Sequence, residues 1–342
     1  MNKEIKLNQT IINQSSEPYF IAEIGSNHNQ DLGIAKELIH ISADCGANAV
    51  KFQSLNLERQ YSQSAQTEDL KKLFQKIKLD ENWYTELAEE AKKAKVDFCS
   101  APTYIESIEL LEQVNIPFYK LASPQIRTFP TLINKVSALQ KPILLSVGYC
   151  NYSLIERAIE ICKAQGNENI ILLHCVSEYP TKFEKVNLKV LNTLSNMFDS
   201  LVGISDHSEG IEVPVASVAL GAKVIEKHIT LSRTMDGPDH YFALEPQEFK
   251  AMVSASKNVF KSIGAPNKQV TAQEKTFANE ILVRWYAKEN IHKGELITDE
   301  KISFLRGTNA ISDEHFDLLG NIRAKSDIKK SAPILWQNIV KD

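Results

Sequence analysis

The sequence lacks any apolar run long enough to cross a bilayer, and its first twenty residues lack the apolar core of a signal peptide. It also has no basic stripe, because the net charge is −4 and charges of both signs are interspersed. The cysteines are few, scattered and without a C-x-x-C pair, which argues against a disulfide framework or a cysteine-rich zinc site: Cys45, Cys99, Cys150, Cys162 and Cys175. These absences predict a cytoplasmic protein that binds neither nucleic acid nor membrane.

What is present is a chain of 342 residues, 43% hydrophobic and 24% charged, which is enough for one large domain and a smaller one. Eight short β-rich runs alternate with longer helical patterns. The expected strands are 19–25, 48–53, 96–101, 118–123, 143–148, 170–175, 201–206 and 223–228, and the expected helices are 32–47, 83–94, 105–114, 129–138, 153–165, 187–196, 210–220 and 246–262. This repeat predicts a (β/α)₈ TIM barrel over residues 1–263. A doubly wound open sheet is the alternative, but such sheets seldom contain eight uniform units.

The pattern changes after residue 263. Residues 264–281 are polar with Gly and Pro, which is typical of a linker with at most one short helix. Short apolar patches broken by turns follow, among them "HKGELIT" and "KKSAPILW". Residues 282–342 are therefore expected to form a small β-rich domain.

Polar residues end the expected barrel strands, at the face where (β/α)₈ enzymes build their active sites. In chain order they are Glu23, Lys51, Gln53, Ser100, Lys120, Ser123, Ser146, His174, Ser177, Asp206, His207, Glu226 and His228. Two buried lysines at one barrel mouth need an anionic partner, which is either a structural carboxylate or a ligand. Lysines beside hydroxyl groups favour a phosphate or phosphoester ligand. The alternative is that one of the lysines acts as a nucleophile and forms a Schiff base.

His207 and His228 end two successive strands. Neighbouring strand ends lie close together, so the two imidazoles could share one divalent ion, and two histidines leave positions open for water and substrate. Histidine ligands suit Mn, Fe, Co or Zn better than Mg. Asp206 and Glu226 are then candidates to orient the rings or to act as acid–base groups. The alternative is a pair of core histidines. Strand alternation predicts that only one of Asp206 and His207 reaches the lumen.

His174 stands beside Cys175, which suggests a thiol nucleophile. Cys175 follows the apolar run "ILL", however, and no third group is obvious nearby. A buried structural cysteine is the preferred interpretation.

Several segments together resemble the sialic acid synthase (N-acetylneuraminate synthase, or nonulosonate synthase) family. They are "FIAEIGSNHNQDLGIAKELI", "GANAVKFQS", "FYKLASP", "LLHCVSEYPT", "GISDHSEG", "IEKHIT" and "GPDHYFALEP". The C-terminal "RGTNAIS" and "GNIRAKSDIKKSAPI" resemble the SAF (antifreeze-like) domain of these enzymes. The resemblance covers nearly the whole chain.

The resemblance implies a reaction in which phosphoenolpyruvate condenses with an open-chain N-acyl hexosamine, such as N-acetylmannosamine. The products would be a nine-carbon 2-keto sugar acid and phosphate. It also implies a divalent metal, with Mn²⁺ preferred over Mg²⁺ or Co²⁺, and a domain-swapped homodimer. A legionaminate-type or pseudaminate-type precursor remains open as the sugar.

The resemblance also implies roles for individual residues. His207 and His228 match metal ligands, Glu23 matches an acid–base residue, and Glu226 lies near the metal. Matches to phosphoenolpyruvate contacts are Lys51, Lys120, Ser123, Ser146 and Ser205, and matches to sugar-side positions are Gln53, Tyr179 and Asp239. Arg306 matches an arginine that reaches the partner subunit's active site and contacts the sugar's N-acyl group.

Three departures from the family pattern bear on specificity. Ala101 stands where threonine is frequent, Ser177 stands where some members have asparagine, and the Arg306 loop reads "LRGTNAIS" rather than R-P-G-[NT]-G. These departures leave the identity of the amino sugar open, more than the type of reaction. A metal-dependent pyruvate aldolase and a carbohydrate- or surface-binding protein on a degenerate barrel are the alternative functions. The binding-protein alternative predicts that lysines or histidines are missing at the strand ends, and all of them are present in the sequence.

Overall fold

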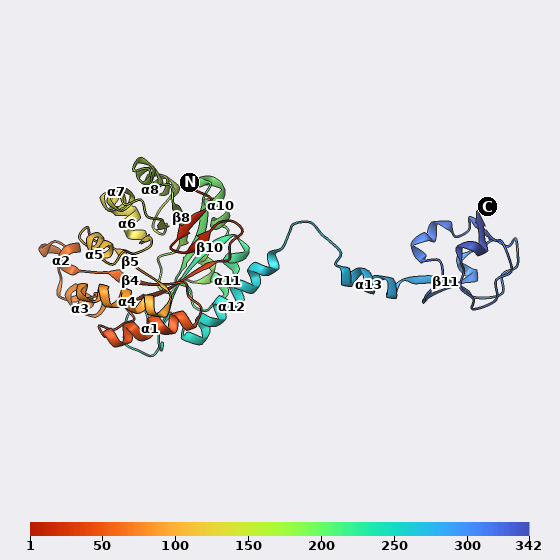
Figure 1. Cartoon of the computed structure of the whole chain (residues 1–342), viewed down its shortest axis with the longest axis horizontal. Helices are drawn as coiled ribbons and strands as arrows, with labels where there is room; N and C mark the ends of the chain where they lie inside the picture. Colours follow the sequence, from red (N-terminus) through yellow and green to blue (C-terminus); the bar gives the residue numbers. More distant parts are fainter. Residues whose placement is uncertain (342) are drawn as a thin grey trace. The chain divides into compact units, whose positions relative to one another are not determined.

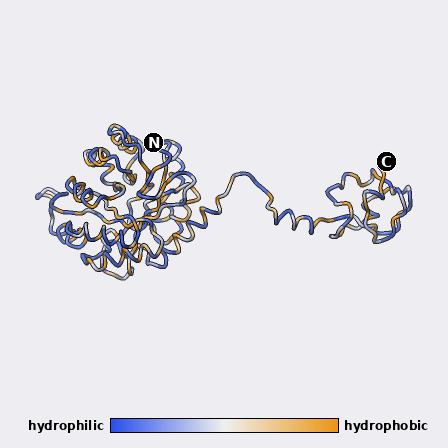
Figure 2. The backbone as a smooth tube through the Cα atoms, in the orientation of Figure 1, coloured by the Kyte–Doolittle hydropathy of each residue, from blue (hydrophilic) through white to orange (hydrophobic). Residues whose placement is uncertain are grey.

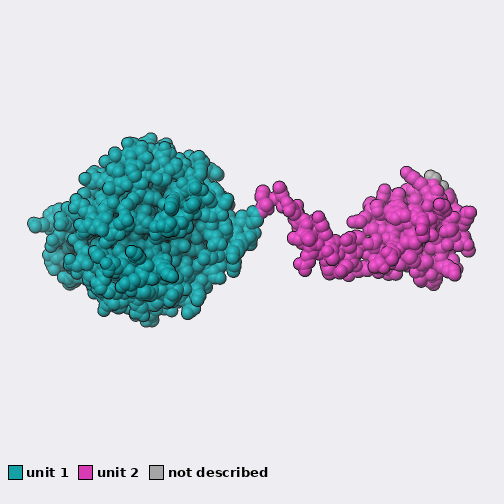
Figure 3. Space-filling view, in the orientation of Figure 1, with its two compact units in different colours: residues 1–264 teal, residues 265–342 magenta. Residues whose placement is uncertain are grey.

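The computed structural model of the chain describes residues 1–341. The chain divides into two compact units, Met1–Gly264 and Ala265–Asp342, which are coloured separately in Figure 3. Each unit is described by itself.

The first unit is built on eight parallel strands (Figure 1). They are β3 (Tyr19–Gly25), β4 (Ala49–Ser54), β5 (Asp97–Pro102), β6 (Tyr119–Leu121), β7 (Ile143–Ser146), β8 (Ile170–Cys175), β9 (Leu201–Asp206) and β10 (Ala222–His228). Their hydrogen-bonded order is β5-β4-β3-β10-β9-β8-β7-β6. The two edge strands, β5 and β6, lie beside each other and close the sheet into a barrel. The predicted (β/α)₈ barrel is therefore confirmed.

A helix follows each strand, as the periodicity predicts. These helices are α1 (Leu32–Asp44), α4 (Tyr84–Ala94), α5 (Ser107–Gln113), α7 (Pro130–Ala138), α8 (Tyr152–Ala164), α10 (Val190–Phe198), α11 (Glu212–Ala219) and α12 (Pro246–Ile263). Four further helices were not predicted: α2 (Leu57–Gln60), α3 (Glu68–Ile77), α6 (Ser123–Thr128) and α9 (Phe183–Val186). Within residues 1–341, no helix combines the length and the hydropathy that a membrane span requires.

Side-chain caps mark where the longer helices begin. Asp31 accepts a hydrogen bond from the Ile34 N–H at the start of α1, and Asn151 accepts one from Leu154 at the start of α8. At α12, Glu245 and Glu248 form a reciprocal capping box. Hydrophobic and hydrophilic residues alternate along the helices (Figure 2), and the buried apolar residues of the helices belong to one core cluster with those of the strands.

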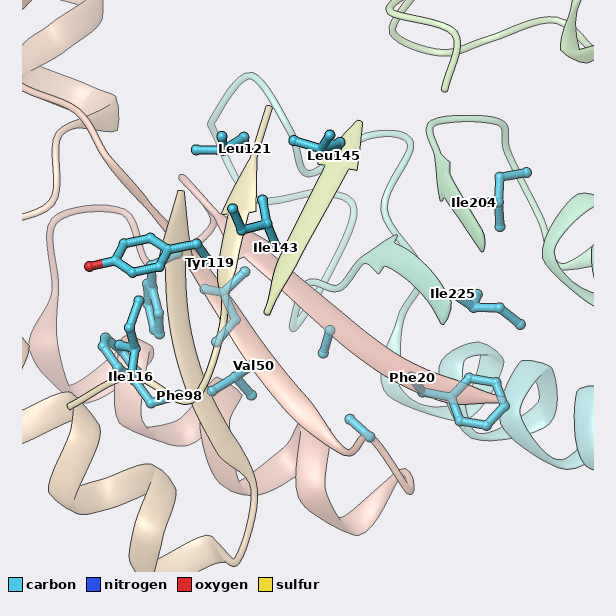
Figure 4. Packing of buried hydrophobic residues seen from close by; sticks show 14 of the residues in the cluster. Phe20, Val50, Phe98, Ile116, Tyr119, Leu121, Ile143, Leu145, Ile204 and Ile225 are labelled. Carbon is cyan, nitrogen blue, oxygen red and sulfur yellow. The ribbon is translucent and has the colours of Figure 1, made fainter. Parts of the chain in front are cut away.

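Alternate residues of each strand face two different cores. Phe20, Val50 and Ile204 point outward and pack under the helices, in the larger cluster shown in Figure 4. Tyr19 and Ala49 belong to a second cluster inside the barrel. Because both faces are apolar, the strands are buried along their whole length.

An N-terminal hairpin that was not predicted plugs one end of the barrel. Strands β1 (Ile5–Leu7) and β2 (Thr10–Ile12) pair antiparallel and add their apolar side chains to the inner cluster. In the turn between them, Asn8 Nδ2 donates to Asp97 Oδ1 at 2.5 Å, at the start of β5. The hairpin covers the N-terminal ends of the strands, so the opposite end is the one that opens to solvent.

The second unit begins with helix α13 (Ala272–Ile281), followed by a small β-rich body. Strands β11 (Val283–Ala287) and β12 (Ile302–Arg306) form one antiparallel pair, and β13 (Ile322–Ala324) and β14 (Ile339–Lys341) form another. Trp285 is fully buried among isoleucines, and its Nε1–H donates to Asp313 Oδ1 at 2.9 Å. This unit therefore has its own hydrophobic core.

Candidate active site

A cavity of about 270 Å³ opens at the carboxyl ends of the barrel strands. The predicted site residues that line it are Glu23, Lys51, Gln53, Lys120, Ser123, Ser177, Tyr179, Ser205, His207, Glu226 and His228. Further lining residues that the sequence did not single out include Gln60, Tyr61, Thr103 and Gln125, and Cys175 also lines the cavity. The cavity is therefore polar and draws on strands around most of the barrel.

Two lysines and two glutamates form a buried charge cluster at the base of the cavity. Lys51 Nζ lies 2.6 Å from Glu23 Oε2 and 3.7 Å from Glu226 Oε1, while Lys120 Nζ lies 3.0 Å from Glu226 Oε1. Ser205 donates to the same Glu226 oxygen at 3.0 Å. The anionic partners of the lysines within the chain are thus carboxylates, so any anionic ligand has to share the lysines with them.

The cluster gives its two carboxyls different proton affinities. Burial raises the pKa of Glu23, and Lys51 only partly opposes it. Burial also acts on Glu226, but Lys120 and Lys51 outweigh it and lower the pKa of Glu226 to about 2. Glu23 is therefore the carboxyl that more readily holds a proton, and Glu226 stays ionised.

Lys51 is poorly suited to act as a nucleophile. Burial would lower the pKa of Lys51, but Glu226 and Glu23 outweigh burial and raise it. A Schiff base requires a neutral amine. The Schiff-base alternative is not favoured at this residue.

Hydroxyl groups gather on the β6–β7 side of the cavity. The Gly148 N–H donates to Ser123 Oγ at 3.0 Å. A Cβ at Gly148 would lie only 2.7 Å from Ser123 Oγ and 2.5 Å from Ser177 Oγ, so the absent side chain lets both hydroxyls come close. Ser146 Oγ is buried and has no hydrogen-bond partner in the part of the chain that the structure describes. Ser146 does not itself line the cavity.

The His207 and His228 rings lie edge to face, with centroids 5.6 Å apart and an interplanar angle of 61°. His207 Nδ1 donates to the Val176 carbonyl at 2.8 Å, which leaves Nε2 with the free lone pair. Burial, with a further contribution from His207, holds the pKa of His228 well below its usual range. His228 Nδ1 has no hydrogen-bond partner among residues 1–341, although Asp239 Oδ2 lies 4.0 Å away.

His228 suits a divalent cation, because metals bind neutral imidazole nitrogens. Burial lowers the pKa of His207, but its contacts with the Cys175 thiol and the Val176 carbonyl outweigh burial and raise it, so a cation at His207 has to compete with a proton. Within residues 1–341, however, no three or more His, Cys, Asp or Glu side chains converge to hold a metal. A cation held by His207 and His228 would therefore take its other ligands from water or substrate, as open catalytic sites do.

Aromatic and polar groups form the rim. The Tyr179 ring packs against His207 at a tilt of 39° with the ring centroids 4.2 Å apart, and the Phe242 and His228 centroids are 4.9 Å apart. Gln53 donates to Glu23 Oε1 at 2.7 Å. Asp239 accepts a hydrogen bond from Ser26 Oγ at 2.8 Å, which holds it beside the mouth although it does not line the cavity.

Three strand-end residues that the sequence placed at the mouth face the helices instead. Ser100 Oγ lies 2.9 Å from Ser54 Oγ, and His174 Nε2 lies 2.6 Å from the Val186 carbonyl. Asp206 pairs with Lys227. Within residues 1–341, Asp206 makes no hydrogen bond to either imidazole, so any effect on their orientation has to pass through the backbone. Alternation explains all three, because their lumen-facing neighbours occupy the cavity side.

Cys175 is the reverse case. Sequence reasoning put it in the structural core, but it lies on the same strand face as the inner-cluster residues Ile171 and Leu173 and lines the cavity. Its Sγ lies 3.9 Å from His207 Nδ1 and 3.9 Å from Ser177 Oγ. Counting alternate residues back along β8 would have found it.

Arg306 is the last residue of β12 in the second unit, and it is exposed. Its predicted reach into a partner subunit's site stays a prediction.

Comparison with known proteins places this geometry in a family. The profile of the NeuB family matches residues 38–268, and that of the SAF domain matches residues 286–340. An N,N'-diacetyllegionaminic acid synthase of Campylobacter jejuni is 39% identical over 90% of this chain and 96% of its own length. A pseudaminic acid synthase of Helicobacter pylori is 33% identical over 94% of this chain and 98% of its own.

A solved structure agrees with these relatives. The N-acetylneuraminic acid (sialic acid) synthetase of Leptospira borgpetersenii superposes with a TM-score of 0.75 at 32% identity, covering 82% of this chain and 97% of that one. The family match spans most of the barrel. It includes every strand end that lines the cavity except that of β3, which precedes the matched residues. The chain belongs to the NeuB family and has a C-terminal SAF domain.

Proposed function

We propose that this protein condenses phosphoenolpyruvate with an open-chain N-acyl hexosamine to give a nine-carbon 2-keto sugar acid and inorganic phosphate. A bond forms between C3 of phosphoenolpyruvate and the aldehyde carbon of the sugar, and the aldehyde oxygen becomes a hydroxyl. Water adds at C2 of the phosphoenolpyruvate part, and phosphate leaves. The observation that carries the proposal is the cavity in which Lys51 and Lys120 lie beside a pair of neighbouring imidazoles.

Phosphoenolpyruvate is expected to bind at the lysines and the hydroxyl groups of Ser123 and Ser205, which line the cavity. Ser146, the third serine that the resemblance implies, does not line the cavity and would have to be reached from it. The two lysines are already balanced by two carboxylates, so a multiply charged anion adds unpaired negative charge to a buried site. Uptake of a proton by Glu23, whose pKa burial raises, would relieve that charge. The protonated Glu23 would then supply the proton that the aldehyde oxygen needs as it becomes a hydroxyl.

His207 and His228 would hold the divalent ion, for which Mn²⁺ is the first expectation and Mg²⁺ or Co²⁺ the alternatives. Bound there, the ion would polarise the aldehyde oxygen of the sugar. The free Nε2 of His207 and the unpartnered Nδ1 of His228 support this assignment. Glu226 is expected to stay ionised between the two lysines and to keep them aligned for the anion.

The sugar is expected to lie toward the rim, near Gln53, Tyr179, Ser177 and Asp239. Arg306 would reach the N-acyl group from a partner subunit in a domain-swapped homodimer. Relatives that make legionaminic and pseudaminic acids support precursors of those acids as alternatives to N-acetylmannosamine.

Phosphate release measured across a panel of N-acyl hexosamines, with Mn²⁺ and with a chelator, tests the proposal. We expect release with phosphoenolpyruvate and at least one sugar, and its loss in chelator. Condensation with pyruvate as efficient as with phosphoenolpyruvate would instead establish a pyruvate aldolase.

A further inference from the structure

A buried ion pair lies on the outer face of the barrel, directly behind His207 and His228. In the parallel register of β9 and β10, Asp206 stands opposite Lys227. Lys227 Nζ lies 2.6 Å from Asp206 Oδ2, and the side chains are 0% and 2% exposed. Each member directly precedes one of the histidines in the chain. The pair therefore joins the two strands at the residues next to His207 and His228.

The same pair also fixes the chain on the other side of His207. The Asp206 carboxylate accepts hydrogen bonds from Ser208 N at 3.0 Å and from Ser208 Oγ at 2.9 Å. Lys227 additionally donates to the Ser208 carbonyl. The His207 carbonyl itself accepts from the Thr181 N–H at 2.9 Å. The backbone on both sides of His207 is thus tied to one ammonium on the neighbouring strand.

The rings of His207 and His228 are held in different ways. The His207 ring is held by its own hydrogen bond to Val176, whereas the His228 ring makes none within residues 1–341. The His228 ring packs against Phe242, the His228 carbonyl accepts from the Leu244 N–H at 3.0 Å, and the preceding residue, Lys227, is joined to the β9 strand.

Stability alone does not account for the pair. Burying two charges costs several kcal/mol per ion before they attract each other, and a packed apolar pair of the same volume is often as stable or more so. Unlike an apolar pair, an ion pair fixes the relative orientation of its two side chains, because its hydrogen bonds form only at one geometry. Groups behind metal ligands that fix ligand orientation change metal affinity when they are removed.

We propose that Asp206 and Lys227, with Ser208, are positioning residues that set the separation and orientation of His207 and His228 for a divalent cation. Neither Asp206 nor Lys227 lines the cavity. The inference rests on the proposed function, in which these two histidines hold the metal.

Mn²⁺ titration of the full chain, followed by the electron paramagnetic resonance signal of free Mn²⁺, tests the proposal. We expect Lys227→Met to weaken Mn²⁺ affinity by about tenfold to a hundredfold. Excess Mn²⁺ should restore kcat and the KM for phosphoenolpyruvate to nearly wild-type values. Lys223→Met is the matched control, because Lys223 lies on the same strand, 5% exposed, with its Nζ 3.0 Å from the Ser16 carbonyl, away from the histidines. The Mn²⁺ affinity of Lys223→Met should match that of the wild type.

Thermal unfolding in chelator separates positioning from simple stability. If Lys227→Met melts at a lower temperature but binds Mn²⁺ like the wild type, the pair only stabilises the fold and the proposal is overturned. If Lys227→Met does not fold, Ser208→Ala decides, since it removes one hydrogen bond and should still weaken Mn²⁺ affinity measurably. Unchanged affinity in that variant overturns the proposal. A wild-type protein that binds no Mn²⁺, Mg²⁺ or Co²⁺ overturns the metal assignment itself, and the inference with it.

Discussion

Lys51 Nζ lies between two buried carboxylates, 2.6 Å from Glu23 Oε2 and 3.7 Å from Glu226 Oε1. The same ammonium therefore couples a carboxyl of raised pKa to one of lowered pKa. Such pairs of unlike titratable groups assign acid and base roles at an active site. In this cavity they favour Glu23 as the proton carrier and Glu226 as a permanent charge.

Glu226→Gln should change how stability depends on pH. The folded-state pKa of Glu226 is about 2, below its ordinary value of 4.5. The stabilisation from its charge is therefore fully present above pH 4.5 and is lost as the pH falls toward 2. Urea unfolding of the wild type and Glu226→Gln should show a stability difference that shrinks over this window. A difference that stays constant across it would show that folding does not lower the pKa of Glu226.

Lys120→Ala should raise the KM for phosphoenolpyruvate with little effect on Mn²⁺ affinity. Loss of one charge-assisted hydrogen bond costs about 1.5–3 kcal/mol, so the expected rise is about tenfold or more. The control is Lys141→Ala, because Lys141 also pairs with a glutamate, Glu112 at 2.6 Å, but lies outside the cavity. Steady-state kinetics at saturating Mn²⁺ give the KM for phosphoenolpyruvate of both variants. A Lys120→Ala variant in which only Mn²⁺ binding falls would contradict the assigned role.

His228→Ala should lose Mn²⁺ binding and turnover while the barrel stays folded, because the ring lies at the mouth. His174→Ala is a matched control: His174 also lies near the end of a barrel strand, but its ring contacts the Val186 carbonyl on the outer face. Mn²⁺ titration and circular dichroism of both variants test the assignment. Equal loss of Mn²⁺ binding in the two variants, or retained Mn²⁺ binding in His228→Ala, would contradict the assignment of His228 as a metal ligand.

The sequence predicted where the barrel strands end but not which of two adjacent residues enters the lumen. In β8 the apolar run is buried on both faces, so no polar alternation marks the inner side, and His174 and Cys175 were assigned in reverse. In β9 the polar run itself alternates, which is why His207 was correctly separated from Asp206. The hairpin of β1 and β2 escaped prediction because its three-residue strands are stabilised by the barrel interior rather than by local sequence.

Gly148→Ala should impair phosphoenolpyruvate binding. The added Cβ would lie within 2.7 Å of the Ser123 and Ser177 hydroxyl oxygens, so both side chains must move. We expect a rise in the KM for phosphoenolpyruvate and unchanged Mn²⁺ affinity. The double variant Gly148→Ala/Ser177→Ala removes one of the two clashes and should recover part of the loss. A single variant with wild-type kinetics would mean that this side of the cavity does not hold the anion.

Cys175 offers a direct probe of the cavity, because it lines the cavity whereas the other four cysteines do not. Cys45, Cys99 and Cys162 are buried outside the cavity, and Cys150 is half-buried. In a Cys150→Ser background, N-ethylmaleimide should modify Cys175, and saturating phosphoenolpyruvate should slow the reaction because the ligand fills the cavity around Ser177 and His207. Intact-mass spectrometry follows the adduct, and Cys175→Ala should abolish it. Labelling at a rate independent of phosphoenolpyruvate would place the anion elsewhere in the barrel and would remove the main support for the lysine and serine assignments.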